Sequence, residues 1–176
     1  RHPAGGRQPR RVLVGMSTAL DEHDAQVCPA LVRVDDRLLH GQVALNWVRA
    51  LRPARILIVD DALAHDSLAR DALMAASPPG IEVWIGEAQE AVQELAGNRW
   101  RAARTMVLLR DPISARRLYE AGLGYRRLNV GAVGLAPGRV RVGRQVSLTR
   151  DEWEALRYLQ QAGIDVTLQP LPSDQA

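Results

Sequence analysis

The sequence predicts a single α/β domain built on an open, mostly parallel sheet of about seven strands with helices on both faces. Strand-like and helix-like segments alternate five or more times along the 176 residues. The early strands are continuously apolar, as strands are when helices cover both faces of a parallel sheet. This length suits one domain with its own core better than two.

The first half of the chain is expected to contain three strand–helix units. Strands are predicted at residues 31–34, 55–60 and 81–85, and helices at 42–51, 66–77 and 87–97. Val43, Trp47 and Leu51 recur on one face of the first helix. An acidic N-cap begins the second helix and two prolines end it, while Gly97 closes the third.

The second half continues the alternation and ends on a strand. Strands are predicted at residues 105–109, 126–131, 144–148 and 164–172, with helices at 111–122 and 148–163. Asp111 at the cap and Pro112 at the first position mark the start of one helix. Thr149 and Glu152, three residues apart, predict a capping box at the start of the other.

Residues 1–29 have the composition of a leader or linker, and the domain is expected to occupy 30–176. Arginine, glycine and proline come first, and no periodic apolar pattern follows. We therefore expect a poorly ordered segment. Because the chain begins at Arg1 and has Met16 inside, a misplaced start, an expression remnant and a linker from a larger fusion all stay open.

Composition excludes several kinds of chemistry. The net charge is only +3, without a basic run and with 4% aromatic residues, so nucleic acid is not an expected partner. All 23 basic residues are arginine, which excludes a Walker A lysine and a pyridoxal phosphate Schiff base. Cys28 is the only cysteine, which excludes an intrachain disulfide and suits the cytoplasm. No apolar run approaches the roughly 20 residues of a membrane helix.

The segment DDRLLHGQ, after the first strand, carries the groups needed to handle a phosphoryl group. Ligands of open α/β sheets bind outside the carboxyl ends of the strands, where the loops DDALAHD and NVGAVG should also lie. His40 supplies an imidazole that is nucleophilic near neutral pH. Gly41 leaves room for phosphate, and the helix opening near Gln42 offers unpaired N–H groups. Arg37 can add a bidentate contact, and Asp35 or Asp36 could orient the ring.

Structural explanations remain open for these residues. A histidine near a helix start is often a capping or packing residue, and Arg37 with the aspartates could be a surface ion-pair cluster. His65 could help to position phosphate or be an exposed loop residue. Asp60 and Asp61 have the look of a metal or acid pair, but capping of the next helix is the commoner role of such acids and is expected here. The histidines lack metal-ligand spacing, so no metal site is expected. Trp47 and Trp153 are expected in the core, and Leu38 and Leu39 either in the core or beside an exposed His40.

The body of the chain resembles the IIB component of the mannose/fructose/sorbose family of the bacterial sugar phosphotransferase system. The resemblance covers about residues 31–174, through LVRVDDRLLHGQVALNW, ILIVDD, SPPGIEVWI, LNVGAVG and the closing VSLTRDEWEALRYLQQAGIDVTLQPLPSD. The motif R-x-D-D-R-L-x-H-G-Q is specific. Two departures, at Ser77-Pro78 and Gly131-Ala132, lie outside the histidine loop.

The resemblance implies a protein-N(pi)-phosphohistidine–sugar phosphotransferase. His40 would be the phosphorylated residue, with Arg37 and Asp35 in the same site. A phosphorylated IIA protein would be the donor, and membrane IIC/IID components holding a sugar the acceptor, with the chain in the cytoplasm at the inner face of the membrane. No cofactor is implied, and a homodimer stays open. The alternatives are a regulatory IIB-like relay domain without transport and a nucleotide-binding domain, although the latter lacks its glycine fingerprint.

Overall fold

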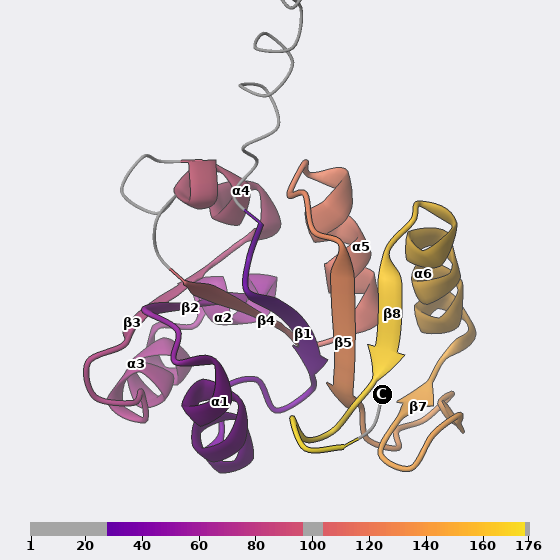
Figure 1. The fold of residues 1–176 in the computed structure, drawn as a ribbon, viewed down its shortest axis with the longest axis horizontal. Helices are drawn as coiled ribbons and strands as arrows, with labels where there is room; N and C mark the ends of the chain where they lie inside the picture. Colours follow the sequence, from indigo (N-terminus) through magenta and orange to yellow (C-terminus); the bar gives the residue numbers. More distant parts are fainter. Residues whose placement is uncertain (1–27, 97–103, 175–176) are drawn as a thin grey trace, which may run out of the picture.

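The computed structural model describes residues 28–96 and 104–174, which form an open sheet of six parallel strands with helices on both faces (Figure 1). Along the sheet the strand order is β3-β2-β4-β1-β5-β8. The strands are β1 (Leu31–Asp35), β2 (Arg55–Val59), β3 (Glu82–Gly86), β4 (Thr105–Leu109), β5 (Arg127–Ala132) and β8 (Asp165–Leu168). The fold class predicted from the sequence is therefore confirmed, with β1 between β4 and β5.

The strand predicted at residues 144–148 does not join this sheet. Only Ser147–Leu148 of it form a strand, β7, which pairs antiparallel with β6 (Val140–Arg141) in a separate two-stranded ribbon. One bridge between Val133 and Val146 connects the ribbon region to the end of β5. The glycines and proline of residues 131–143 favour turns over a long strand, which explains why the ribbon stays short.

The helices lie close to their predicted positions. They are η1 (Val43–Val48, a π-helix) continued by α1 (Arg49–Leu51), α2 (Asp61–His65), α3 (Ser67–Ala75), α4 (Ala88–Ala96), α5 (Pro112–Glu120) and α6 (Arg150–Gln161). Asp66, Asp111 and Thr149 cap their helices as predicted. The sequence analysis took 61–65 as a loop, which was wrong, because a helix of five residues is too short to show a periodic pattern.

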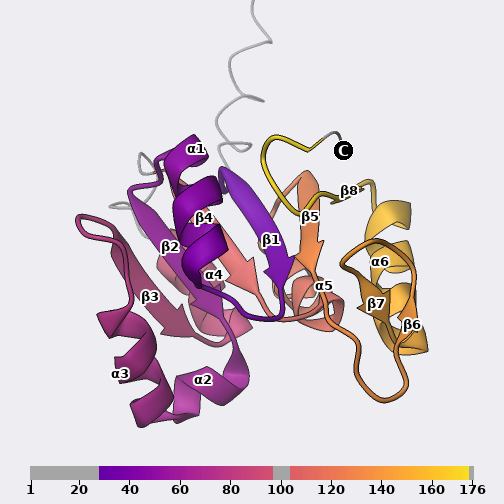
Figure 2. The ribbon, with the colours of Figure 1, turned by 90° about the horizontal axis from the view of Figure 1, so that it is seen from below.

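Two apolar layers cover the sheet, one on each face. The helix of η1 and α1 lies with α2 on one face, and α4, α5 and α6 lie on the other (Figure 2). Residues alternate along β1, so Val32 and Val34 face the second layer while Arg33 and Asp35 face the first helix. Trp47 is in the core as predicted, but Trp153 is not: 49% of its surface is exposed, on the outer side of α6.

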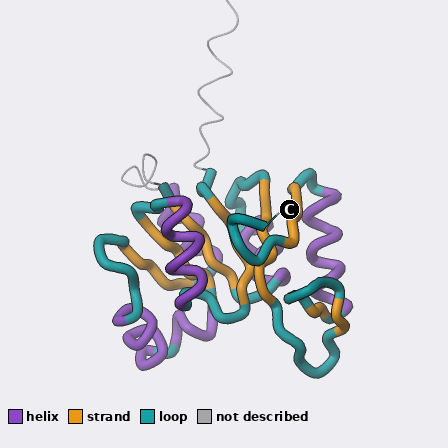
Figure 3. The backbone as a smooth tube through the Cα atoms, turned by 60° about the horizontal axis from the view of Figure 1, so that its bottom comes forward, coloured by secondary structure: helices purple, strands orange, loops and turns teal. Residues whose placement is uncertain are grey.

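After β8 the chain turns back over the face of the sheet that carries the first helix (Figure 3). The indole N–H of Trp47 donates to the carbonyl of Pro170 at 3.0 Å. Gln169 and Leu171 are tied to Asp174 by hydrogen bonds within the segment. This C-terminal segment, residues 169–174, thus connects β8 to the first helix.

The capping box of α6 gives a stability prediction. Burial raises the pKa of Glu152, but hydrogen bonds from Arg139 and Thr149 and the charge of Arg139 outweigh it and bring that pKa below its usual value. The lowered pKa stabilises the fold above about pH 4.5, and this stabilisation is lost as the pH falls through the folded-state pKa. We expect Glu152→Gln to lower the free energy of unfolding by about 1–2 kcal/mol at pH 7 and by less at pH 3, measured by urea denaturation.

The control for this prediction is Glu154→Gln in the same helix. Glu154 pairs with Arg150 on the exposed side of α6, where both side chains are more than half exposed. Exposed pairs contribute little, so this variant should unfold like the wild type at both pH values. A deficit of Glu152→Gln that is equally large at pH 3 would contradict the role given to its charge.

Candidate functional site

Four loops meet at the carboxyl edge of the sheet and are joined by polar contacts. Arg110, directly after β4, donates to the Asp36 carbonyl at 3.2 Å and to the Asp60 carboxylate at 2.5 Å. Asp36 in turn accepts from the backbone N–H of Gly134 at 2.7 Å. The loops after β1, β2 and β5 therefore come together as predicted, and Arg110 adds a fourth loop that the sequence analysis did not include.

His40 lies at the end of the β1 loop, directly before the first helical residue. Its Nδ1 is 3.0 Å from the carbonyl oxygen of Leu38 and 3.8 Å from Oδ1 of Asp35. Its Nε2 is buried, and the described part of the chain offers that atom no hydrogen-bond partner. The side chain as a whole is 19% exposed. In this ring orientation Nδ1 is engaged by the Leu38 carbonyl and Nε2 is buried, while part of the ring is exposed.

Two leucines anchor the histidine loop in the core. Leu38 and Leu39 are both buried and pack in the same apolar layer as Val43 and Trp47. Leu38 has a φ of 53°, a left-handed conformation that is costly for a branched apolar residue. Of the two interpretations left open for these leucines, the core is confirmed. The expectation of an exposed His40 beside apolar surface residues was wrong, because the leucines pull the loop inward.

Asp35 connects the loop to the strand that carries it. Its Oδ1 accepts from the backbone N–H of Arg37 at 3.3 Å, so the carboxylate closes the turn after β1. The Nε of Arg37 lies 3.8 Å from the same oxygen, which is beyond hydrogen-bond distance. The Arg37 side chain is 53% exposed. Its guanidinium is thus at the surface beside the histidine loop.

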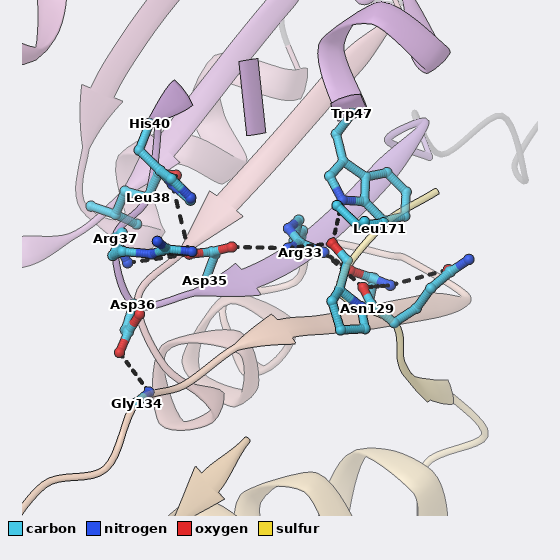
Figure 4. Close-up of polar contacts among 12 residues, drawn as sticks. Arg33, Asp35, Asp36, Arg37, Leu38, His40, Trp47, Asn129, Gly134 and Leu171 are labelled. Atoms are coloured by element: carbon cyan, nitrogen blue, oxygen red, sulfur yellow. Dashed lines mark hydrogen bonds and ion pairs between the residues drawn. The ribbon is translucent and has the colours of Figure 1, made fainter. Parts of the chain in front are cut away.

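The other carboxylate oxygen of Asp35 binds a buried arginine (Figure 4). A terminal nitrogen of Arg33 donates to Oδ2 of Asp35 at 2.8 Å, and both side chains are almost fully buried. The same guanidinium donates to Oδ1 of Asn129, to the carbonyl of Gln169 at 3.0 Å and to the carbonyl of Pro170 at 3.2 Å. Carboxylate, amide and carbonyl oxygens therefore surround one positive charge.

The environment of Arg33 is apolar apart from these oxygens. Its guanidinium carbon lies 4.9 Å from the ring centre of Trp47, a cation–π arrangement. Burial brings the pKa of Arg33 below its usual value, and the charge and hydrogen bond of Asp35 offset this only in part. A Cβ on Gly131 would come within 1.8 Å of the guanidinium. Glycine at this position of β5 is therefore required by the close approach of Arg33.

The helix that follows His40 begins at Gly41 and continues through Gln42, and both residues are exposed. The first N–H groups of a helix have no partner within the helix, so this end can accept an anion. A Cβ on Gly41 would meet no atom within 4 Å, and its φ is not in the left-handed region. Packing thus gives no reason for glycine here, whereas the approach of a ligand to the backbone would.

The contacts of the other predicted candidates, His65 and Asp60, differ from those of His40. His65, at the end of α2, is largely exposed and contacts the Asp61 carbonyl at 2.9 Å and Glu87 at 3.5 Å. The hydrogen bond to Asp61 and the charge of Glu87 raise its pKa. Asp60 caps α2 through the N–H of Leu63, which confirms its capping role. Within residues 28–96 and 104–174, no three His, Cys, Asp or Glu side chains are placed to hold a metal ion.

Sequence reasoning missed Arg33, Asn129 and Arg110. One signal was available: Arg33 and Asp35 are two apart on a strand, so their side chains share a face. Arg33 is also the first residue of the motif R-x-D-D-R-L-x-H-G-Q. Asn129 stands beside Arg33 in the β1–β5 register, a pairing that depends on strand order and has no local signature.

The fold and the site define a doubly wound α/β domain with a histidine at the carboxyl edge of its sheet. Residues 29–176 match the family model of the PTS system sorbose subfamily IIB component. The chain belongs to this family. It is a IIB component of the sugar phosphotransferase system. Among its described helices, none is long and apolar enough to span a membrane.

Individual relatives agree with this assignment. The sorbose-specific EIIB component of Lacticaseibacillus casei is 31% identical over 144 residues, covering 82% of this chain and 88% of the relative. The mannose-specific EIIAB component of Escherichia coli K12 is 30% identical over 144 residues, but the chain spans only 45% of its length. The crystal structure of the IIBSor domain of the sorbose permease from Klebsiella pneumoniae superimposes with a TM-score of 0.80 at 29% identity, covering 84% of this chain and 91% of that one.

The buried ion pair gives a stability prediction. Asp35→Asn removes the charge that compensates Arg33, and breaking a buried pair by removing one partner typically costs about 3–5 kcal/mol. The neighbouring Asp36→Asn keeps an acceptor for the Gly134 N–H at a partly exposed position and should cost less than about 1 kcal/mol. Urea unfolding of the two variants measures the difference. Equal losses would show that the Arg33–Asp35 pair has no special weight in the fold.

Proposed function

We propose that this chain accepts a phosphoryl group from a phosphohistidine of a IIA protein onto His40 and passes it to a sugar held by membrane IIC/IID components. The main support is the position of His40, which is an imidazole at the carboxyl edge of the sheet, directly before a helix start. A helix N-terminus and an exposed arginine both attract anions. Membership of the IIB family supports the same assignment.

The transfer needs an unprotonated ring nitrogen on His40. In the first step a new N–P bond forms to His40 while the N–P bond of the donor histidine breaks. His40 releases the proton of its other ring nitrogen, and the donor imidazole takes up a proton. In the orientation described above Nδ1 contacts the Leu38 carbonyl and Nε2 is buried, so the ring turns away from Leu38 before attack. Phosphoryl transfer has a loose transition state, and positioning with charge stabilisation provides most of the catalysis.

Two groups would stabilise the transferred phosphoryl group, and a third would hold the loop that carries them. Arg37 contributes a guanidinium that is not hydrogen-bonded to Asp35. The N–H groups at Gly41 and Gln42 contribute the helix end, and Asp35 keeps the loop in shape through its bond to the Arg37 N–H. In the second step a sugar hydroxyl attacks phosphorus and the N–P bond to His40 breaks. The proton lost by the hydroxyl is balanced by the proton that the His40 imidazole regains. The second step places the chain at the inner face of the membrane while it contacts IIC/IID.

The proposal predicts a labile phosphate on one residue. Incubation with phosphoenolpyruvate, enzyme I, HPr and a IIA protein should give a product whose phosphate is lost in acid and kept in base. His40→Ala should abolish this label, whereas His65→Ala should keep it, because His65 contacts Asp61 and Glu87 instead of the site. Intact-mass measurement and radiolabel counting provide the readouts. A label that persists in His40→Ala would place the acceptor elsewhere.

Gly41 allows a second prediction that separates activity from stability. Gly41→Ala adds a Cβ that meets no protein atom within 4 Å, so the free energy of unfolding should change by less than about 1 kcal/mol. The same methyl group would occupy the approach of a phosphoryl group to the helix end. We expect phosphorylation of His40 to slow at least tenfold, as followed by quenched-flow labelling. An unchanged rate would remove Gly41 from the site.

A further inference from the structure

Arg33 connects the strand before the histidine loop to three other parts of the fold. It lies on β1 behind the histidine loop, and its partners come from β5, from the C-terminal segment and from the first helix. It is buried too deeply to touch a phosphoryl group itself. Its contacts nevertheless end on Asp35, one of the three side chains assigned to the site.

We propose that Arg33 is a positioning residue for phosphoryl transfer at His40, acting through the carboxylate of Asp35. Asn129 and the carbonyls of Gln169 and Pro170 complete its binding site and set its position. The inference rests on the proposed function, because it concerns the rate of the same transfer. It adds to that function a residue and a C-terminal segment that would otherwise be considered structural.

The two oxygens of the Asp35 carboxylate have different partners. Oδ2 of Asp35 accepts from Arg33 at 2.8 Å, while Oδ1 faces the Arg37 N–H at 3.3 Å and His40 Nδ1 at 3.8 Å. Because a carboxylate is planar, fixing one oxygen fixes the direction of the other. Arg33 therefore determines where Oδ1 meets the histidine loop.

Arg33 also affects the position of Arg37. A buried carboxylate requires a compensating positive charge, and Arg33 provides it at hydrogen-bond distance. Arg37 consequently stays 3.8 Å away from Asp35 and is more than half exposed. Without Arg33, Asp35 would attract the Arg37 guanidinium inward and withdraw it from the phosphoryl group. The buried arginine thus leaves the exposed one available for the substrate.

Several contacts fix the position of Arg33. Asn129 and two carbonyl oxygens accept from its two terminal nitrogens, and Trp47 packs against its face. Gly131 allows the guanidinium to lie directly on the backbone of β5. Misplacement of a catalytic group by about 1 Å can cost roughly a hundredfold in rate, so an arginine held this closely matters for positioning.

The test measures kcat and KM for phosphoryl transfer from a phosphorylated IIA protein to the full chain. Arg33→Gln should lower kcat about tenfold to a hundredfold with KM changed less than about threefold, because the substituted side chain is buried and its expected effect is on the position of groups beside His40. Asn129→Ala loosens Arg33 without removing it and should lower kcat in the same direction by a smaller factor. Asn129→Ala also keeps the inference testable if Arg33→Gln does not fold.

A matched control is Arg55→Gln. Arg55 is also a fully buried arginine on a strand, but it lies in β2 and pairs with Glu94 of α4, on the other face of the sheet. This variant should lose stability in urea while its kcat stays within about twofold of the wild type. Comparable loss of kcat in Arg55→Gln would mean that the effect of Arg33→Gln is general destabilisation, which overturns the inference.

A double-mutant cycle tests whether Arg33 acts through Asp35. If it does, Arg33→Gln in an Asp35→Asn background should lower kcat by less than about threefold, far below its effect alone. Multiplicative effects of the two changes would overturn the inference, as would a rise in KM with unchanged kcat. Wild-type protein that takes up no phosphate would instead overturn the proposed function. Labelled wild type with unchanged kcat in both Arg33→Gln and Asn129→Ala would overturn the role of Arg33 alone.

Discussion

The ion pair between Arg33 and Asp35 lies inside the domain, at the end of β1 and directly before the histidine loop. Burying two charges is costly, and their attraction compensates only where the remaining donors and acceptors are also satisfied. Asp35 meets this requirement through the Arg37 N–H. The two terminal nitrogens of Arg33 meet it through oxygens from β5 and the C-terminal segment, whereas its buried Nε has no hydrogen-bond partner among the described residues. The centre of the sheet is therefore organised around one compensated pair of charges.

This pair accounts for features that are otherwise unconnected. Gly131 is needed because the guanidinium lies on the backbone of β5, and Asn129 provides an acceptor in register with Arg33. The irregular C-terminal segment, in turn, supplies two carbonyl oxygens to the same guanidinium. A helix packed in its place would use its carbonyls in its own hydrogen bonds, so an irregular segment suits a buried arginine better.

The histidine loop is buried at its leucines and exposed where the first helix begins. Leu38 and Leu39 are buried in the apolar layer under the first helix, whereas Gly41 and Gln42 are exposed. The left-handed Leu38 shows that core packing outweighs local backbone preference at this point. A loop held by buried leucines beside an accessible helix start keeps His40 in a defined position at the edge of the sheet.

Local signals in the sequence determined much of this protein. Apolar runs and helix caps predicted the parallel α/β class and most element positions, since Asp66, Asp111 and Thr149 each act within three residues of themselves. The motif around His40 located the candidate site. The placement of Arg33 and Asp35 on one face could also have been inferred from their spacing.

Only the tertiary structure decided which residues contact Arg33 and Asp35. Arg33 is 96 residues from Asn129 and 136 from Gln169, and their contact depends on strand order, which periodicity does not specify. The exposure of Trp153 and the separation of β6 and β7 from the main sheet were likewise decided by packing. A sequence pattern indicates which face of a strand or helix carries a side chain. The residues that contact this side chain come from distant parts of the chain, so a local pattern does not specify them.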